Sequence, residues 1–365
     1  MYPTASAMND EEPPLKKNKL LIEPTLNLSL PDDLVVSILA RVSILYYPTL
    51  SLVSKSFRSH LTSPELYQTR SLLGRKDNCL YVCLRFSTTD PKPRWFMLCR
   101  RPNTNETRKK KKEKSSGYVL ATIPIPHSPP AHGSGLVAVG SNIYKVGGSI
   151  NGSPSSSVSI LDCWSHTWLE APSMRVKRDH PSANFLDGKI YVTGGCRVVI
   201  DIFPDQKTSI VVVNAKQYIF GDNVAYNLKD GEWTSFSGWR WSSSFVIENV
   251  LYYYYYEEGF KWYDTKVRSL RSRTVKGMKR LPKFARHANV RLVDYGGKMA
   301  LFWDNFVASG GGGGYQNRRI WCAMISLERR NNSEEIWGNV EWHDAVLPHP
   351  IPRGYIFEHV IAVTV

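Results

Sequence analysis

Cysteine and histidine are the residues through which this chain could bind a metal or supply a catalytic nucleophile. Cys79 and Cys83 flank a strand-like run and Cys99 follows without a fourth nearby ligand, so the paired spacing of a zinc site is missing. The nine histidines are scattered, and no GxSxG, HExxH or GxxxxGK motif occurs. We therefore expect no catalytic residue, no metal site and no cofactor, and we expect the six cysteines to be reduced and mostly buried.

Aromatic side chains next to arginine supply binding energy rather than reaction chemistry. Trp239, Arg240 and Trp241 lie together in the polar segment SGWRWSSS, which makes them the candidate substrate-binding residues of the chain. The run from Tyr252 to Tyr256 instead fills both faces of a strand, because successive side chains alternate between the faces, and core packing is the favoured interpretation. The glycine run 310–314 lacks the Lys-Ser/Thr of a phosphate loop and indicates a linker.

Helical periodicity dominates residues 30–74. Leu34, Ile38 and Val42 recur every four residues, and a helix is expected to begin at about Pro31, with Ser29 and Asp32 as its start signal. A second helix is expected from Pro48 to Leu61. A third follows from the cap Ser63 to Gly74, which is positioned to end it. Three helices in about 45 residues bury too little apolar surface to be stable alone, so much of that surface should be shared with another protein.

Beyond residue 77 the chain consists of short β-rich runs. The first strands are expected at 78–86 and 94–102. The stretch GSNIYKVGG at 140–148 recurs as DGKIYVTGG at 187–195, and looser copies lie at 248–259 and 296–305. Ile143 and Ile190 are 47 positions apart, Leu251 and Met299 are 48 apart, and the middle interval is 61. A period near 48 is that of a four-stranded propeller blade.

The repeats predict a β-propeller. The 288 residues from 78 to 365 would make six blades at 48 residues each, and we expect five or six, some of them degenerate. The glycine pairs are expected to end inner strands, and the recurring tryptophans, such as Trp168, to pack between blades. The segment 355–365 should be the closing strand. The insertion after Gly195 predicts a distorted blade.

Charge is concentrated outside these elements. Residues 1–26 are polar and non-periodic and are expected to be a disordered tail. Between Arg100 and Lys114 eight basic and two acidic residues contribute 8 − 2 = +6 of the net +15. We interpret 102–118 as a solvated basic loop, with a nuclear-import signal and nucleic-acid binding as the alternatives.

The helical segment resembles an F-box. The matching residues run in order through the segment: Leu30-Pro31, Asp33-Leu34, Ile38-Leu39, Val42, Leu50, Leu52-Val53-Ser54-Lys55, Phe57-Arg58 and Ser63-Pro64. In that family the helices dock onto a Skp-type adaptor, which links them to a cullin. The resemblance implies that the adaptor-facing set is Leu30, Pro31, Leu34, Ile38, Leu39, Val42, Leu50 and Val53, and the alternative is that some of these residues form the core of the module itself.

As a whole the chain resembles the plant F-box/kelch-repeat family, an α + β multidomain architecture with a three-helix F-box at 27–75 and an all-β kelch-type propeller at 78–365. The resemblance implies a non-catalytic substrate-recognition subunit of a Skp–cullin–F-box ubiquitin ligase, whose propeller binds an unknown target protein. The alternatives are a non-degradative scaffold and a basic-surface nucleic-acid-binding protein, the latter less favoured. No run of 18 apolar residues and no secretory signal occurs, so we expect an intracellular protein of the nucleus, the cytoplasm or both, with no membrane partner.

Overall fold

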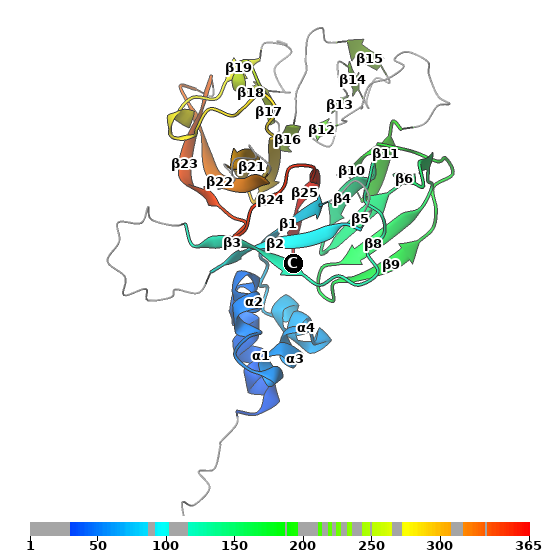
Figure 1. Cartoon of the computed structure of the whole chain (residues 1–365), viewed down its shortest axis with the longest axis vertical. Coiled ribbons are helices and arrows are strands. Elements are labelled where there is room, and N and C mark those ends of the chain that lie inside the picture. The colour runs from blue at the N-terminus through cyan, green and yellow to red at the C-terminus, as the bar shows by residue number, and fades with distance from the viewer. Residues whose placement is uncertain are drawn as a thin grey trace, which may run out of the picture.

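The structure is a computed structural model of the chain, shown in Figure 1. It describes residues 30–86, 92–101, 116–186, 188–195, 211–213, 218–220, 224–227, 232–235, 243–248, 250–264, 272–307, 317–332 and 334–365. A cluster of short helices comes first, and a ring of β-sheets follows.

The helices are α1 (Asp32–Arg41), the 3-10 helix η1 (Ile44–Tyr46), α2 (Tyr47–Leu50), α3 (Lys55–Leu61) and α4 (Pro64–Leu72). The expected single helix from Pro48 to Leu61 is therefore wrong, because a turn after Leu50 divides it into α2 and α3. Ser54 has an extended backbone with φ −156°, and its hydroxyl accepts a hydrogen bond from the Phe57 amide at 3.0 Å. That hydroxyl caps a new helix, and capping serines favour helix starts over helix interiors.

The helix predicted from Ser63 is confirmed. Pro64 occupies its first turn, and the Ser63 hydroxyl accepts from the Leu66 amide at 3.4 Å. Gly74 follows the helix with φ +62°, the left-handed conformation that glycine adopts most readily.

The β region forms a ring of antiparallel sheets (Figure 1). The first has the order β25 (Ile356–Thr364), β1 (Asn78–Arg85), β2 (Arg94–Arg100), β3 (Tyr118–Ile123). The second has β4 (Gly135–Val139), β5 (Asn142–Val146), β8 (Val158–Asp162), β9 (Thr167–Ala171). A small ribbon, β6 (Ser149–Ile150) with β7 (Ser153–Pro154), lies between β5 and β8 in sequence.

The remaining sheets continue around the ring. The third pairs β10 (Ser182–Leu186) with β11 (Lys189–Thr193), and the fourth contains β12 (Val211–Val213), β13 (Tyr218–Phe220), β14 (Val224–Asn227) and β15 (Glu232–Ser235). The fifth contains β16 (Ser243–Ile247), β17 (Val250–Tyr255), β18 (Gly259–Asp264) and β19 (Arg273–Thr274). The sixth contains β20 (Arg291–Tyr295), β21 (Lys298–Val307), β22 (Asn317–Arg330), β23 (Glu335–Ala345) and β24 (Ile351–Pro352), and η2 (Met278–Arg280) precedes it.

Six inner strands close the ring within the described residues. They contact one another in the order β25, β4, β10, β12, β16, β20 and back to β25. The C-terminal strand β25 pairs with β1, Asn78 opposite Thr364, so the two ends of the β region meet in one sheet as expected. This pairing leaves no open edge at the seam. The predicted propeller of five or six blades is confirmed.

The sequence repeats correspond to second strands rather than to the inner strands we expected. Ile143, Leu251 and Met299 lie on β5, β17 and β21, each the neighbour of an inner strand, and all three are fully buried. The repeated motif starts at the turn that precedes the second strand, so its apolar core lies one strand farther from the ring axis. The prediction for Trp168 is confirmed, because its ring lies 6.0 Å from that of Trp95 in the neighbouring sheet.

The long interval between the second and third repeats has a structural explanation. The strands β12 to β15 form a sheet of their own, whose inner strand lies between those of the sheets that start at β10 and β16. We expected extra residues within one blade. The second strand of this sheet, β13, carries no copy of the glycine-pair motif, so the interval between recognisable copies is longer here.

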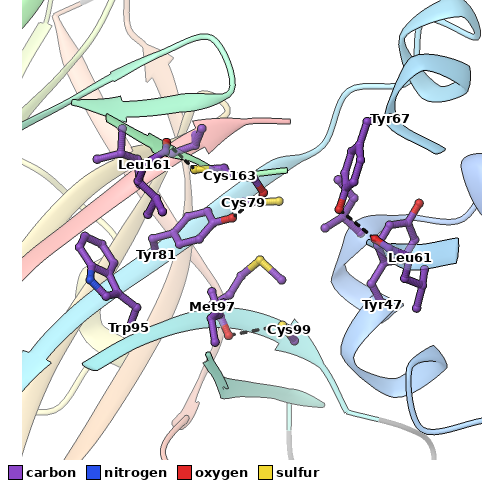
Figure 2. Close-up of a cluster of buried hydrophobic side chains, with 14 of the residues drawn as sticks. Tyr47, Leu61, Tyr67, Cys79, Tyr81, Trp95, Met97, Cys99, Leu161 and Cys163 are labelled. Carbon is purple, nitrogen blue, oxygen red and sulfur yellow. Dashed lines mark hydrogen bonds between the residues drawn. The ribbon is translucent and has the colours of Figure 1, made fainter. Parts of the chain in front are cut away.

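The helices and the ring share one hydrophobic core. Figure 2 shows Tyr47, Leu61 and Tyr67 of the helices facing the strands that carry Cys79 and Cys99. The Tyr67 ring also stacks on Trp164 at 5.5 Å, in the turn between β8 and β9. We expected the apolar surface of the helices to be shared with another protein, and part of it is instead covered by the propeller of the same chain.

A buried arginine links the helices to the ring. The Arg70 guanidinium donates to the carbonyls of Ala40 and Val42 at 3.1 and 2.7 Å and to the Asp77 carboxylate at 2.6 Å. Asp77 also accepts from the amide of Ile44, and its backbone exchanges two hydrogen bonds with that of Val365, next to β25. One side chain therefore connects α1, α4, the linker and the closing strand.

The other predictions for the core agree with the structure. Tyr252, Tyr253 and Tyr254 are buried on β17, whereas Tyr256 is exposed where the strand ends. The five described cysteines are free and buried, and Cys196 lies outside the described residues. No single described helix is long and apolar enough to span a membrane, although α1 and η1–α2, bent by 107°, pass that test as a pair.

Replacing Arg70 by Met should lower the free energy of unfolding by on the order of 3 kcal/mol, because the Asp77 carboxylate and two carbonyls lose their donor. Urea unfolding followed by tryptophan fluorescence measures this change. Arg75→Met, at an exposed position five residues later, is the matched control and should change stability by less than about 0.5 kcal/mol. Equal effects of the two substitutions would contradict a structural role for Arg70.

Candidate functional site

One side of α1 presents large apolar side chains to solvent. Leu30, Leu34 and Ile38 are spaced by four residues and are 56%, 48% and 52% exposed. Pro31, which precedes the helix, is exposed as well. Residues four apart lie on the same side of a helix, so Leu34 and Ile38 share one side of α1, and Leu30 and Pro31 extend the exposed stripe from the segment before it.

The turn between α2 and α3 adds to this apolar surface. Leu52 and Val53 are 76% and 63% exposed, and the Ser51 hydroxyl donates to the Pro48 carbonyl at 2.8 Å at the start of the turn. Val53 belongs to the predicted adaptor-facing set, whereas Leu52 does not. Leu52 lies next to Val53 in the motif Leu-Val-Ser-Lys, and this position was the signal that could have identified Leu52 as part of the surface. Leu72 at the end of α4 is 89% exposed and was also missed.

Three residues of the predicted set are placed differently. Leu39 is only 2% exposed and packs in the core that the helices share with the ring, while Val42 and Leu50 are half-buried against that core. Leu39 therefore cannot contribute to a surface in this conformation. Apolar residues surround much of α1, so the periodicity alone did not show which side faces the protein interior.

Hydrogen bonds fix the orientation of the exposed stripe. The Tyr47 hydroxyl donates to the Leu39 carbonyl at 3.0 Å, and His60 Nε2 lies 3.2 Å from Asp32 Oδ1 at the start of α1. Burial raises the pKa of Tyr47 although the neighbouring Arg70 lowers it. The hydroxyl therefore remains a donor at every physiological pH.

The second candidate surface is the end of the propeller away from the helices. The helices join the ring at Asn78, the first residue of β1, which lies opposite Thr364 near the end of β25. The inner strand β25 therefore begins at the other end of the ring, and the remaining inner strands begin there as well. We call it the distal face and define it by the connections 124–134, 172–181, 275–290 and 346–355, which lead into β4, β10, β20 and β25. The predicted substrate-binding residues Trp239, Arg240 and Trp241 lie outside the described residues, as do the tail and most of the basic loop.

A cavity of about 540 Å³ lies between the inner strands. Ser134, Ser182, Ser244, Asp294 and His359 are among the residues that line it, and they come from five different sheets or their connections. The cavity therefore occupies the axis of the ring.

Ser134 and His359 are the one described pair in this cavity that resembles a nucleophile with its base. Ser134 Oγ lies 3.2 Å from His359 Nε2, but the hydroxyl donates to the Ala131 carbonyl at 2.7 Å and so accepts from the imidazole. Burial lowers the pKa of His359 to about 4. A histidine that donates through Nε2 cannot withdraw the serine proton, and the arrangement is structural.

No group of three or more described His, Cys, Asp or Glu residues could hold a metal ion. Burial raises the pKa of Cys99 and of Cys163 to about 12. These thiols stay protonated and unreactive at neutral pH.

Comparison with known proteins agrees with this arrangement. The F-box domain model matches residues 27–69, and the model of the FKB95, Kelch-repeats domain matches residues 95–347. The putative F-box/kelch-repeat protein At1g19930 of Arabidopsis thaliana is 65% identical, covering 96% of this chain and 100% of the relative. The chain belongs to the plant F-box/kelch-repeat family.

Other members of the F-box/kelch-repeat family are similar over their full length. The putative F-box/kelch-repeat protein At1g60570 is 53% identical over 98% of this chain, and the F-box/kelch-repeat protein At4g39550 is 51% identical over 96%, covering 100% and 99% of those Arabidopsis proteins. An F-box followed by kelch repeats is the domain arrangement of an F-box substrate adaptor.

The partly buried His359 makes stability depend on pH in a predictable direction. Its folded pKa of about 4 lies below the unfolded value, so the unfolded state binds the proton more strongly. The stabilisation by neutral His359 is present above about pH 6.5 and is lost as the pH falls toward 4, by roughly 3 kcal/mol in total. His359→Gln removes this contribution, and urea unfolding of both proteins from pH 7 to 4 measures it. A pH-independent stability difference between them would contradict a neutral, partly buried His359.

Proposed function

We propose that this protein is the substrate-recognition subunit of a Skp–cullin–F-box ubiquitin ligase. The exposed stripe of Leu30, Leu34 and Ile38, on helices fixed rigidly to a propeller, is the observation that carries the proposal. The propeller binds a target protein, and the protein itself performs no bond chemistry. The proposed site of action is inside the cell, in the nucleus, the cytoplasm or both.

The apolar stripe is the proposed docking surface for the Skp-type adaptor. Leu34 and Ile38 on α1 and Val53 in the α2–α3 turn are large side chains that gain stability only when a partner covers them. Exposed apolar patches on soluble proteins mark interaction sites. Leu39, Val42 and Leu50 support this surface from below, and Leu52 extends it.

Proximity is the proposed mechanism. Binding the target and the ligase at once raises the effective concentration of target lysines near the conjugating enzyme, on the order of millimolar for a short connection. The gain depends on both partners being engaged in a compatible geometry, which favours a rigid connection. The Arg70–Asp77 ion pair and the stack of Tyr67 on Trp164 provide it.

Substituting Asp for Leu34 and Ile38 together should weaken adaptor binding by at least about a hundredfold, because docking would then bury two unpaired carboxylates. Both positions are exposed, so unfolding by urea should be little changed. Isothermal titration of the purified full chain with a Skp-type adaptor measures the affinity.

The matched control is Leu169→Asp with Ile150→Asp, two exposed apolar residues of the propeller. This control should bind the adaptor like the wild type. Adaptor binding that survives in the Leu34/Ile38 variant would refute the docking surface.

A non-degradative scaffold is the second candidate function, since it would use the same docking surface. Reconstitution with the adaptor, a cullin complex and a conjugating enzyme separates the two. A ligase subunit should support ubiquitylation of a protein that is bound to its propeller. The Leu34/Ile38 variant should not support it. Adaptor binding without any ubiquitylation would favour the scaffold.

A further inference from the structure

The distal face of the propeller carries a strong excess of positive charge. Its four connections contain nine Lys or Arg residues and a single acidic residue, Asp179, together with five of the nine histidines of the chain. The connection 275–290 has five basic residues and no acidic one. Two of them are engaged with β23, Lys276 with the Glu335 carboxylate and Arg280 with the Val340 carbonyl. The exposed Lys283, Arg286 and Arg353 create a positive potential at the distal face.

The acidic side chains near this end are engaged with cationic or donor groups of the protein itself. The Asp304 carboxylate is fully buried and accepts from Arg318 at 2.7 Å and from Asn289. The other pairs are Glu358 with Arg85, and Glu258 with Lys261 in the β17–β18 turn. These three carboxylates therefore do not offset the exposed cations on the distal face, and Asp179, beside His180, is the single acidic residue of the four connections.

Some of the cations surround an aromatic ring. The guanidinium of Arg318 lies 4.3 Å and that of Arg353 5.6 Å from the centre of the Phe306 ring, and the His287 ring lies 4.8 Å from it. Arg353 and His287 are exposed, as are Lys283 and Arg286 in the same connection as His287. Arginine held on an aromatic ring is oriented for a carboxylate, and the ring offers apolar contact beside it.

The neighbouring connections are held rigidly. The amide of His180 donates to the Gly133 carbonyl at 2.6 Å, and the amide of Gly148 donates to the Arg178 carbonyl at 2.9 Å. Gly148 has φ +101°, and a Cβ there would lie 2.8 Å from the His132 carbonyl, so this turn fits only glycine. Ten of the 22 prolines of the chain lie in the four connections. A preorganised surface loses little entropy when a flexible segment binds it.

The axial cavity lies beside two of these connections. Ser134 and Pro181, which end two of them, line the cavity together with inner-strand residues. At about 540 Å³ it is large enough for one or two side chains of a bound segment but far too small for a nucleic-acid duplex. Arg85 and Arg291 lie near Glu358 beside the cavity, and Asp294 lines it.

We propose that the distal face binds an acidic segment of the target protein, with its carboxylates on Arg353 beside Phe306 and on the exposed Lys283 and Arg286. The proposal rests on the proposed function as a target-binding subunit and names the chemistry that the target must offer. A protein segment fits better than a nucleic acid because the Phe306 ring offers apolar contact beside the cations and the axial cavity has the size of a side chain.

Charge reversal tests the surface. The variant Lys283→Glu, Arg286→Glu, Arg353→Glu changes three exposed residues of the distal face, and the matched control Arg75→Glu, Lys76→Glu, Lys189→Glu changes three exposed residues away from it. Both lower the net charge equally. The probe is a fluorescein-labelled twelve-residue peptide of three Glu-Asp-Phe-Ala repeats, and fluorescence anisotropy with the full chain measures its affinity.

The wild type and the control should bind this peptide with equal affinity, and the distal-face variant roughly tenfold or more weakly. A peptide of Gln-Asn-Phe-Ala repeats should bind none of the three. Equal binding of the acidic peptide to both variants would overturn the proposal. So would tighter binding of a single-stranded oligonucleotide of equal net charge, which would indicate nucleic acid as the partner.

Adaptor affinity, measured on the same variants, is a separate readout. If peptide binding fails while adaptor binding persists, the distal-face proposal alone is wrong. If the adaptor does not bind the wild type, the proposed function is wrong whatever the peptide shows.

Discussion

The buried ion pair between Arg70 and Asp77 is the interaction on which the two-part architecture depends. The Arg70 side chain is 4% exposed, and its guanidinium has acceptors on α1, on the segment after it and on the linker. A buried guanidinium is tolerated only where such partners are present, so the helices and the linker must adopt this one arrangement. The backbone of Asp77 then pairs with Val365, which extends the constraint to the strand that closes the ring.

This ion pair holds the helices against the ring, so the two parts pack into one hydrophobic core at the junction between them, which we call the joint. The helices alone would leave Leu61 and Tyr67 without a complete core, and the strands of the first two sheets complete it. The division of the α1 surface is a consequence: Leu39 faces the joint, whereas Leu34 and Ile38 face away from it. A helix with apolar residues on most sides thus serves the stability of its own chain with one face and remains available to a partner with the other.

Sequence patterns predicted the architecture well and the site less well. The repeat period found the second strands through Ile143, Leu251 and Met299, because fully buried positions must stay apolar, but β13 carries no copy of the glycine-pair motif and was not found. The sequence predicted that Ser63 caps a helix. It did not predict that Ser54 caps one too, because a serine can also lie in the interior of a helix, and the expected helix ran through this position. The partnership of Arg70 with Asp77 and the assembly of the distal face are tertiary, and no local pattern reports them.

The placement of carboxylates, rather than the net charge, determines where the surface is positive. The chain has 32 acidic residues, yet near the distal face Asp304 and Glu358 are each paired with an arginine of the protein. Asp304 orients Arg318 beside Phe306, so one carboxylate both stabilises the hairpin of β21 and β22 and positions a guanidinium near the exposed cations. Because the helices attach at the other end of the ring, a segment bound there would lie well away from the Leu34 stripe. Both surfaces can therefore be occupied together, which is the geometric condition for bringing two partners into proximity.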